Sequence, residues 1–162
     1  MRILIVLFLL SLVPALSKAQ STNAPQGFAI WSAAHIKEVG DRLEKELGDK
    51  KIVFETLGHY KGHSVYLVLR GKTSDPEFHE TESDIQIGVR GTATFVVGGE
   101  LVNPKKLPRK QQRGSAINGG AKFPIGPGDV LHVPVAVPHV AIIEPNKPFM
   151  YILIKLDEEP LE

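Results

Sequence analysis

Apolar residues recur at spacings of three and four in the segment after Ser32. They are Ala33, Ile36, Val39, Leu43 and Leu47. This spacing places them on one face of a helix. Ser32 can cap its first turn, and Gly48 can end it. We therefore predict one amphipathic helix within residues 20–50, which begin as a polar linker.

From residue 52 onward the pattern changes to short runs rich in β-branched and apolar residues, separated by glycine and proline. Such runs predict β-strands. The predicted strands cover residues 64–70, 84–90, 92–97, 100–102, 130–133, 140–143 and 149–156. The pair Gly98 and Gly99 separates two of these runs, which is typical of a β-hairpin. One helix followed by many short strands predicts an all-β sandwich or barrel over residues 51–162.

Residues 103–120 interrupt this pattern, because they include few apolar and no acidic residues. The basic residues of this stretch are Lys105, Lys106, Arg109, Lys110 and Arg113. We expect a loop without regular structure, and a loop of this length in a compact domain is either mobile or functional. Two interpretations stay open: a solvated excursion, or a basic lid that attracts an anionic ligand to the barrel mouth.

The N-terminal segment has the features of a secretory signal. Residues 3–16 are almost entirely apolar and follow the basic Arg2, and a small–x–small tripeptide ends at Ala19. The apolar run is shorter than the roughly 20 residues of a membrane-spanning helix, and Pro14 interrupts it. We predict a signal peptide over residues 1–19, cleavage after Ala19, and a secreted or periplasmic protein without a stable membrane anchor.

Composition narrows the classes of function. The chain has 162 residues, of which 43% are hydrophobic, so we expect a single folded domain. Its 19 basic and 18 acidic side chains argue against a dedicated nucleic-acid-binding protein. The absence of cysteine excludes disulfides, cysteine-ligated zinc and a cysteine nucleophile. Any metal must therefore be held by histidine and carboxylate side chains.

Two segments place histidines, a carboxylate and glycines at regular intervals. The first begins at His79 and continues through Asp84 to Gly91, and the second includes Gly128, Pro134 and His139. In this order they resemble the two signature motifs of the cupin superfamily, H-x-H-x(3,4)-E-x6-G and G-x5-P-x-G-x2-H-x3-N. The resemblance implies a cupin-type jelly-roll β-barrel with one N-terminal helix.

The chain departs from these motifs in several ways. Thr81 stands where the second histidine belongs, Ala136 replaces a glycine, and Ile143 replaces the terminal asparagine. Asp84 stands where the glutamate belongs, and the gap between Thr81 and Asp84 is shorter than in the motif. The metal ligands that the resemblance implies are therefore His79, Asp84 and His139. Two histidines and one carboxylate leave coordination positions open and suit a single divalent ion, such as Fe, Mn, Zn or Ni.

Two further residues are candidates for catalysis. Alternation along a strand places Gln86 on the same face as Asp84, where it can orient a substrate. His132 lies within a predicted strand and is a candidate for proton transfer or a structural residue.

The leading hypothesis is an exported small cupin that binds one divalent metal and binds or transforms a small polar, anionic molecule. If it is an enzyme, the resemblance implies an oxygenase, decarboxylase, isomerase or lyase, because the fold alone does not select the reaction. Thr81 motivates an alternative, a metal-free barrel that binds a sugar or another small ligand without catalysis. A third hypothesis is a structural role as a homodimer, since sheet edges need to be covered.

Overall fold

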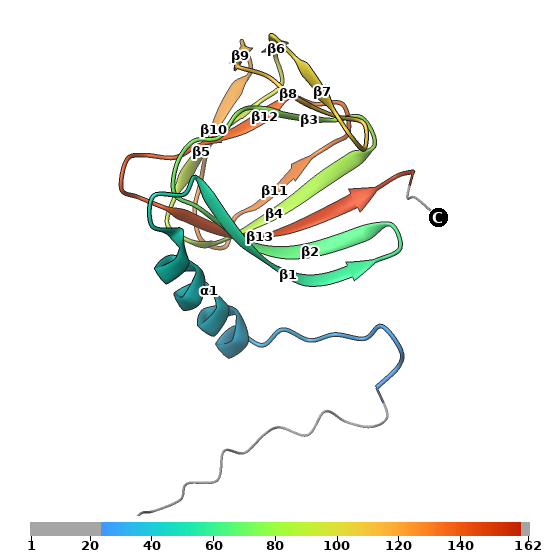
Figure 1. Ribbon diagram of the computed structural model, residues 1–162, viewed down its shortest axis with the longest axis vertical. Helices are drawn as coiled ribbons and strands as arrows, with labels where there is room; N and C mark the ends of the chain where they lie inside the picture. Colours follow the sequence, from blue (N-terminus) through green and yellow to red (C-terminus); the bar gives the residue numbers. More distant parts are fainter. Residues whose placement is uncertain (1–23, 160–162) are drawn as a thin grey trace, which may run out of the picture.

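The computed structural model describes residues 24–159 of the chain. The predicted signal peptide and its cleavage site lie outside these residues. One helix is followed by a series of short strands (Figure 1). Among the described residues, no helix is both long enough and apolar enough to cross a membrane.

Two antiparallel sheets face each other and form the walls of a β-barrel (Figure 1). The five-stranded sheet has the order β1 (Ile52–Tyr60), β2 (His63–Arg70), β13 (Phe149–Asp157), β4 (Glu82–Arg90) and β11 (Val130–Val133). The six-stranded sheet has the order β10 (Ala121–Ile125), β5 (Ala93–Val97), β12 (His139–Ile142), β3 (Glu77–His79), β8 (Gln111–Arg113) and β7 (Lys105–Leu107). The all-β fold predicted from the sequence is thus confirmed.

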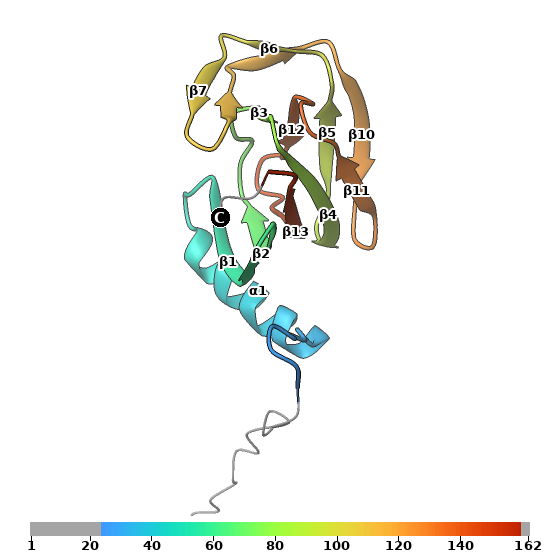
Figure 2. The same ribbon diagram turned by 90° about the vertical axis from the view of Figure 1, so that its right-hand side faces the viewer.

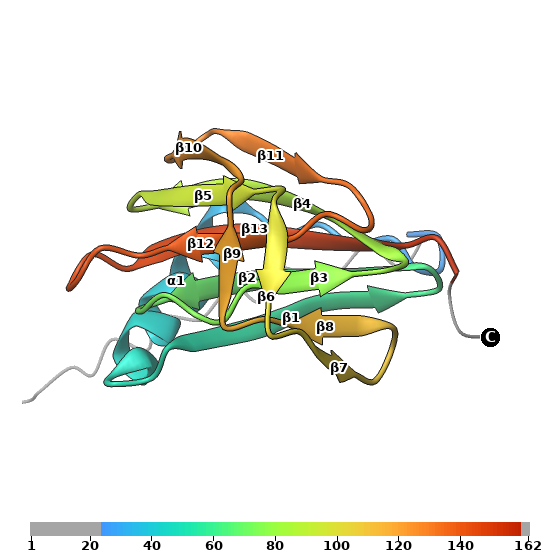
Figure 3. The ribbon, with the colours of Figure 1, turned by 90° about the horizontal axis from the view of Figure 1, so that it is seen from above.

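A third, two-stranded sheet lies beyond the six-stranded sheet, on the side away from the five-stranded sheet (Figures 1 and 2). It consists of β6 (Glu100–Val102) and β9 (Ala116–Asn118). Seen from above, β6 runs across the strands of the larger sheets (Figure 3). The prediction of a hairpin around Gly98 and Gly99 is wrong, because β5 pairs with β10 and β12, whereas β6 pairs with β9. The two glycines instead form the turn that leads the chain from one sheet into another.

The helix α1 (Ala33–Leu47) has the predicted bounds and packs on the outer face of the five-stranded sheet. The Ser32 hydroxyl accepts a hydrogen bond from a backbone N–H of the first turn at 3.2 Å. Val39 and Leu43 are buried against the sheet. Gly48 follows the last turn with a φ of 45°. The prediction of the helix and of its buried face from the apolar periodicity is therefore confirmed.

The five-stranded sheet carries an apolar core on each side. Leu67 of β2 and Met150 of β13 face the helix, whereas Val68 of β2 and Tyr151 of β13 face the barrel interior. Because side chains alternate along a strand, Lys155 lies on the same interior face as Tyr151. This alternation decides which polar side chains enter the barrel.

The expectation of a loop without regular structure over residues 103–120 is wrong. This segment forms the short strands β7, β8 and β9, each paired with another strand. Strands of three residues with polar side chains carry little apolar periodicity, so the pattern could not reveal them.

Candidate metal centre

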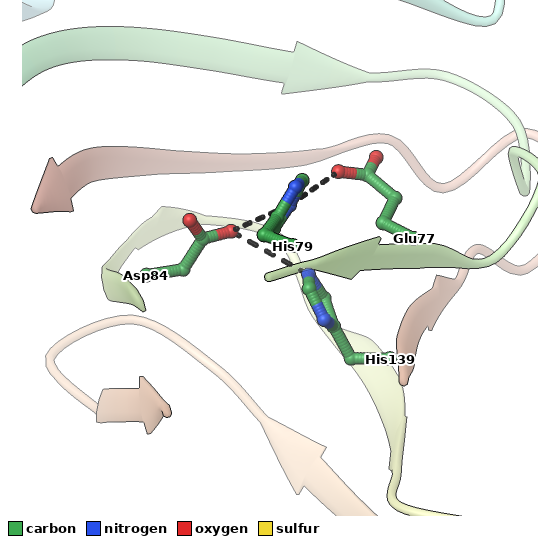
Figure 4. Close-up of side chains that lie close together, drawn as sticks. All are labelled: Glu77, His79, Asp84 and His139. Carbon is green, nitrogen blue, oxygen red and sulfur yellow. Dashed lines mark ion pairs between the residues drawn. The ribbon is translucent and has the colours of Figure 1, made fainter. Parts of the chain in front are cut away.

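Four side chains with nitrogen or carboxylate oxygen donors converge inside the barrel (Figure 4). They are Glu77, His79, Asp84 and His139. One donor atom of each lies within 4.8 Å of the others. The two histidines and Asp84 are no more than 3% exposed. The structure thus brings together the three ligands that the resemblance implied, and it adds Glu77.

These donors come from both walls of the barrel. Glu77 and His79 lie on β3 and His139 lies on β12, so all three belong to the six-stranded sheet. Asp84 lies on β4 of the five-stranded sheet. The cluster therefore depends on the packing of one sheet against the other, and no single strand supplies it.

The spacing of the donors suits a first-row divalent ion. Asp84 Oδ2 lies 3.5 Å from His139 Nε2 and 3.9 Å from His79 Nε2. Glu77 Oε2 lies 3.4 Å from His79 Nε2. Ligand atoms about 2.1 Å from a tetrahedral ion lie about 3.4 Å from one another. Nitrogen and carboxylate donors also match the preferences of zinc, iron, manganese and nickel, so the residues present fit such an ion.

The orientation of His139 adds to this fit. Its Nδ1 lies 3.0 Å from the carbonyl oxygen of Val137, and a carbonyl can only accept a hydrogen bond. Nδ1 therefore carries a proton, and Nε2 is the nitrogen that faces Asp84 Oδ2. This contact is favourable when a proton or a metal ion lies between the two atoms. A backbone partner of this kind commonly orients a metal-binding histidine.

The turn before β12 links the two histidine-bearing segments. The backbone N–H of Ala136 donates a hydrogen bond to the carbonyl of His79 at 2.8 Å. Ala136 has a φ of 58°, in the left-handed region that favours glycine. This backbone conformation explains why the motif has a glycine at this position. The present chain keeps the conformation although it has an alanine there.

Lys155 of β13 is a part of the cluster that the sequence did not reveal. Its Nζ donates to Asp84 Oδ1 at 2.7 Å and to His79 Nε2 at 3.3 Å. It also pairs with Glu82 Oε2 at 3.2 Å. The contact depends on the register between two strands 71 residues apart, in which Lys155 lies opposite Asp84. No local pattern reports such a register.

Glu77 was also missed, although its position contains a signal. It lies two residues before His79, so alternation alone places it on the same face. Arg70 donates to its Oε1 at 2.9 Å, and Arg113 lies 3.5 Å from its Oε2. Burial would raise the pKa of the Glu77 carboxyl, but the contact with His79 and the charges of the two arginines hold this pKa well below its usual value. Glu77 is therefore a carboxylate in the folded protein.

Asp84 is ionised for a similar reason. Burial would raise the pKa of its carboxyl, but the hydrogen bond with His139 and the charge of Lys155 outweigh burial and lower this pKa. In Lys155, burial would lower the pKa of the amine, but the charge and hydrogen bond of Asp84 raise it above its usual value. The cluster therefore combines buried carboxylates with a buried ammonium group.

The two candidate catalytic residues lie in different places. Gln86 is 4% exposed, faces the interior as expected, and its Oε1 has no hydrogen-bond partner among the described residues. His132 is exposed. It lies opposite Ile85, whose side chain points away from the face that carries Asp84. The structure therefore does not support the catalytic role suggested for His132, because its strand register turns it outward.

Acidic partners hold three of the basic residues of the 103–120 stretch. Arg109 donates to Glu82 at 3.1 Å, Lys110 pairs with Glu159, and Arg113 contacts Glu77. Lys105 and Lys106 are exposed on β7. The stretch is thus bonded to the barrel through these three residues, while most of its other residues are exposed.

A cavity of about 580 Å³ opens next to the cluster. Its lining combines aromatic rings with charged groups: Tyr60, His63, Tyr66, Glu82, Arg109 and Lys155. Tyr60 and His63 stack with their ring centroids 4.7 Å apart. Lys155 and Glu82 line the cavity and also contact each other, and Lys155 reaches the donor cluster. None of the four donor residues lines this cavity, so Lys155 and its contacts connect the cavity to the cluster.

No family model matches the sequence, and no curated protein matches it at a significant level. Solved structures do resemble the fold. The cupin-2 domain protein Rru_A2000 from Rhodospirillum rubrum aligns over 69% of this chain and 63% of its own, with 12% identity and a TM-score of 0.50. This likeness shows the fold alone, and it confirms the predicted cupin-type barrel.

Two enzymes are among the other structural neighbours. The polyketide cyclase RemF from Streptomyces resistomycificus has 16% identity and a TM-score of 0.48, over 70% of this chain and 69% of its own. The DMSP lyase DddQ from Ruegeria pomeroyi has 18% identity and a TM-score of 0.49, over 70% of this chain and 50% of its own.

Proposed function

We propose that this chain is a small cupin that binds one divalent metal ion and binds or transforms a small polar, anionic molecule. His79, Asp84 and His139 hold the ion, and Glu77 offers a fourth donor. The observation that carries the proposal is the convergence of these donors, three of them buried, with His139 Nε2 3.5 Å from the Asp84 carboxylate. When bound, the ion supplies Lewis-acid chemistry and open coordination positions.

The protein's own residues support binding of a polar molecule in the neighbouring cavity. Its lining carries the cationic groups of Arg109 and Lys155 beside the carboxylates of Glu82 and Asp157, so it offers charged groups of both signs to a polar molecule. The stacked rings of Tyr60 and His63 add a flat aromatic surface. The unpartnered Oε1 of the buried Gln86 can accept a hydrogen bond from a ligand that enters the barrel. The reaction class stays within the set of cupin oxygenases, decarboxylases, isomerases and lyases.

Elemental analysis of the purified protein tests the metal. We expect about one divalent ion per chain, directly or after reconstitution with Fe, Mn, Zn or Ni. The double variant His79→Ala with His139→Ala should lose the ion. The variant His132→Ala is a matched control that should keep it, because His132 faces outward from β11. A wild-type protein that stays below a tenth of an ion per chain after reconstitution contradicts the proposal.

One observation favours the alternative of a metal-free binding barrel. The ammonium group of Lys155 already contacts Asp84 and His79, so it supplies a positive charge to the cluster. In this alternative the wild type binds no ion under any of the reconstitution conditions above, and the double histidine variant behaves like the wild type.

We further propose that the protein is secreted or periplasmic, on the strength of the signal-like residues 1–19. N-terminal sequencing of the protein from its native host should give a chain that begins at Gln20. Recovery of the uncleaved chain from the cytoplasm contradicts export.

A further inference from the structure

The position of Lys155 creates a conflict within the proposed metal centre. Its Nζ lies 3.3 Å from His79 Nε2, the same atom that faces Asp84 and Glu77. A neutral imidazole has one lone pair on its unprotonated nitrogen. That lone pair can accept a hydrogen bond from an ammonium group or bind a metal ion, but not both. Lys155 in this position and a metal ion on His79 therefore exclude each other.

The surroundings of Lys155 show why it holds this place. Its side chain is 18% exposed and extends from β13 between the carboxylates of Asp84 and Glu82. Asp84 is 2% exposed, and an unbalanced carboxylate at that depth is strongly unfavourable. An ammonium group 2.7 Å from Asp84 Oδ1 supplies the missing positive charge.

The surroundings of Lys155 leave room for a second position of its ammonium group. Lys155 lines the cavity next to the cluster, together with Glu82 and Asp157. Glu82 keeps hydrogen bonds from Arg109 at 3.1 Å and Gln111 at 2.9 Å, whether or not Lys155 contacts it. The ammonium group can therefore turn from His79 toward the cavity and remain beside carboxylates.

We propose that Lys155 is the resident cation of the metal-free cluster, and that a divalent ion binds by displacing its ammonium group from His79 toward the cavity. The metal part of this inference rests on the proposed function. The part that concerns the metal-free protein does not. Lys155 stabilises the metal-free barrel and weakens metal binding, so its removal should change these two properties in opposite directions.

The test compares Lys155→Met with Lys61→Met in the full mature chain. Methionine is an unbranched side chain only one atom shorter than lysine, and it removes the charge. Lys61 lines the same cavity but lies in the exposed turn between β1 and β2, and it serves as the matched control. The measurements are the thermal midpoint in chelator and the dissociation constant for Zn²⁺. We expect Lys155→Met to lower the midpoint by several degrees and to tighten Zn²⁺ binding by about tenfold or more, and Lys61→Met to change neither.

Two results overturn the inference: a metal-free midpoint unchanged by Lys155→Met, or Zn²⁺ binding that becomes weaker. If Lys155→Met does not fold, Lys155→Gln replaces it, with the same expected directions. Zinc binding by Lys155→Met but not by the wild type contradicts displacement, because the ammonium group then excludes the ion and is not displaced by it. If neither protein binds zinc, the proposed metal function and the displacement both fail, and a lower metal-free midpoint still identifies Lys155 as the cation that balances Asp84.

Discussion

The backbone of Ala136 carries strain at the turn that joins the two histidines. Its φ of 58° costs an alanine about 1 kcal/mol or more, whereas glycine adopts this conformation freely. The turn tolerates this cost because the Ala136 N–H is bonded to the carbonyl of His79. The strain is thus located next to a candidate metal ligand.

Replacement of Ala136 by glycine should therefore stabilise the protein slightly. Relief of the strain is partly offset by the larger entropy of the unfolded chain, so we expect a gain of roughly 0 to 1 kcal/mol in the free energy of unfolding. Urea unfolding measures it. Ala116→Gly is the control, because Ala116 is an exposed residue of β9 outside the left-handed region, and it should lose stability. A loss of more than about 1 kcal/mol for Ala136→Gly contradicts the argument.

Tyr151 gives a prediction in alkaline solution. Burial raises the pKa of its phenol to about 12, although the charge of Arg70, which donates to its oxygen at 2.8 Å, acts in the opposite direction. The unfolded chain releases this proton near pH 10. The stability that the raised pKa of Tyr151 contributes is therefore fully present below pH 10 and is lost as the pH rises to about 12. The loss amounts to about 3 kcal/mol.

Guanidinium unfolding between pH 8 and pH 12 measures this loss. Tyr151→Phe should be less stable at pH 8, because Arg70 loses its acceptor, but its stability should fall less steeply above pH 10. Tyr60→Phe, which changes a half-buried ring at the cavity, should keep the steep fall. Equal slopes for Tyr151→Phe and the wild type contradict the assignment.

Residue spacing predicted one part of the cluster and missed another. His79, Asp84 and His139 were implied by the resemblance to the two cupin motifs. Lys155 was not, since its place opposite Asp84 depends on how two distant strands align. His132 shows the reverse error, because a histidine within a strand faces inward or outward according to a register that its neighbours do not reveal.

At the level of elements, the turn between β10 and β11 presses against β4 at Gly88. A Cβ atom on Gly88 would lie 2.0 Å from the carbonyl oxygen of Gly126. Gly88 also donates to the carbonyl of Asp129 and accepts from the N–H of Gly128, both at 3.0 Å. The close approach holds β11 beside the strand that carries Asp84.

The paired variants Gly88→Ala and Gly126→Ala test this contact. We expect Gly88→Ala to lower the free energy of unfolding by at least about 2 kcal/mol, because the backbone must move to admit a methyl group. A Cβ atom on Gly126 meets only Thr92 at 3.7 Å and Asp129 at 3.9 Å, so Gly126→Ala should change stability by less than about 1 kcal/mol. Urea unfolding measures both free energies. Similar losses of stability in the two variants would rule out a specific contact at Gly88.

The elements with strong periodicity were predicted well from the sequence. The helix had its apolar face, its serine cap and its terminal glycine, and the longer strands had alternating or continuous apolar runs. The strands β7 to β9 were missed because their three-residue segments are mostly polar. The false hairpin at Gly98 shows that a glycine pair predicts a turn, but not which strands pair beyond it.

At the level of the whole molecule, metal binding should appear as added stability. A ligand that binds only the folded state at 100 times its dissociation constant adds about 2.7 kcal/mol. For a domain of this size, we expect the thermal midpoint to rise by roughly 5 to 10 °C in Zn²⁺ or Mn²⁺ and to return in chelator. The double variant His79→Ala with His139→Ala should show no rise. An equal rise of the thermal midpoint in both proteins would show that the ion binds outside the proposed metal centre.

The overall fold was more predictable than the chemistry. Two motifs and a succession of short strands were sufficient to indicate a cupin-type barrel, and the likeness to a cupin-2 domain agrees. The chemistry of the cavity depends on side chains such as Arg109, Tyr60 and Lys155, which meet there from separate parts of the chain. These side chains lie close together only in the folded barrel, so no local sequence pattern predicts their proximity.

The donors that come from opposite walls also have a mechanical consequence. The histidines lie on the six-stranded sheet, whereas Asp84 and Lys155 lie on the five-stranded one. A cation shared between them acts as a non-covalent crosslink across the barrel. While the cation is bound, the two sheets cannot separate locally at the cluster. The backbone amides of β3 and β12 should then exchange with deuterium only through global unfolding.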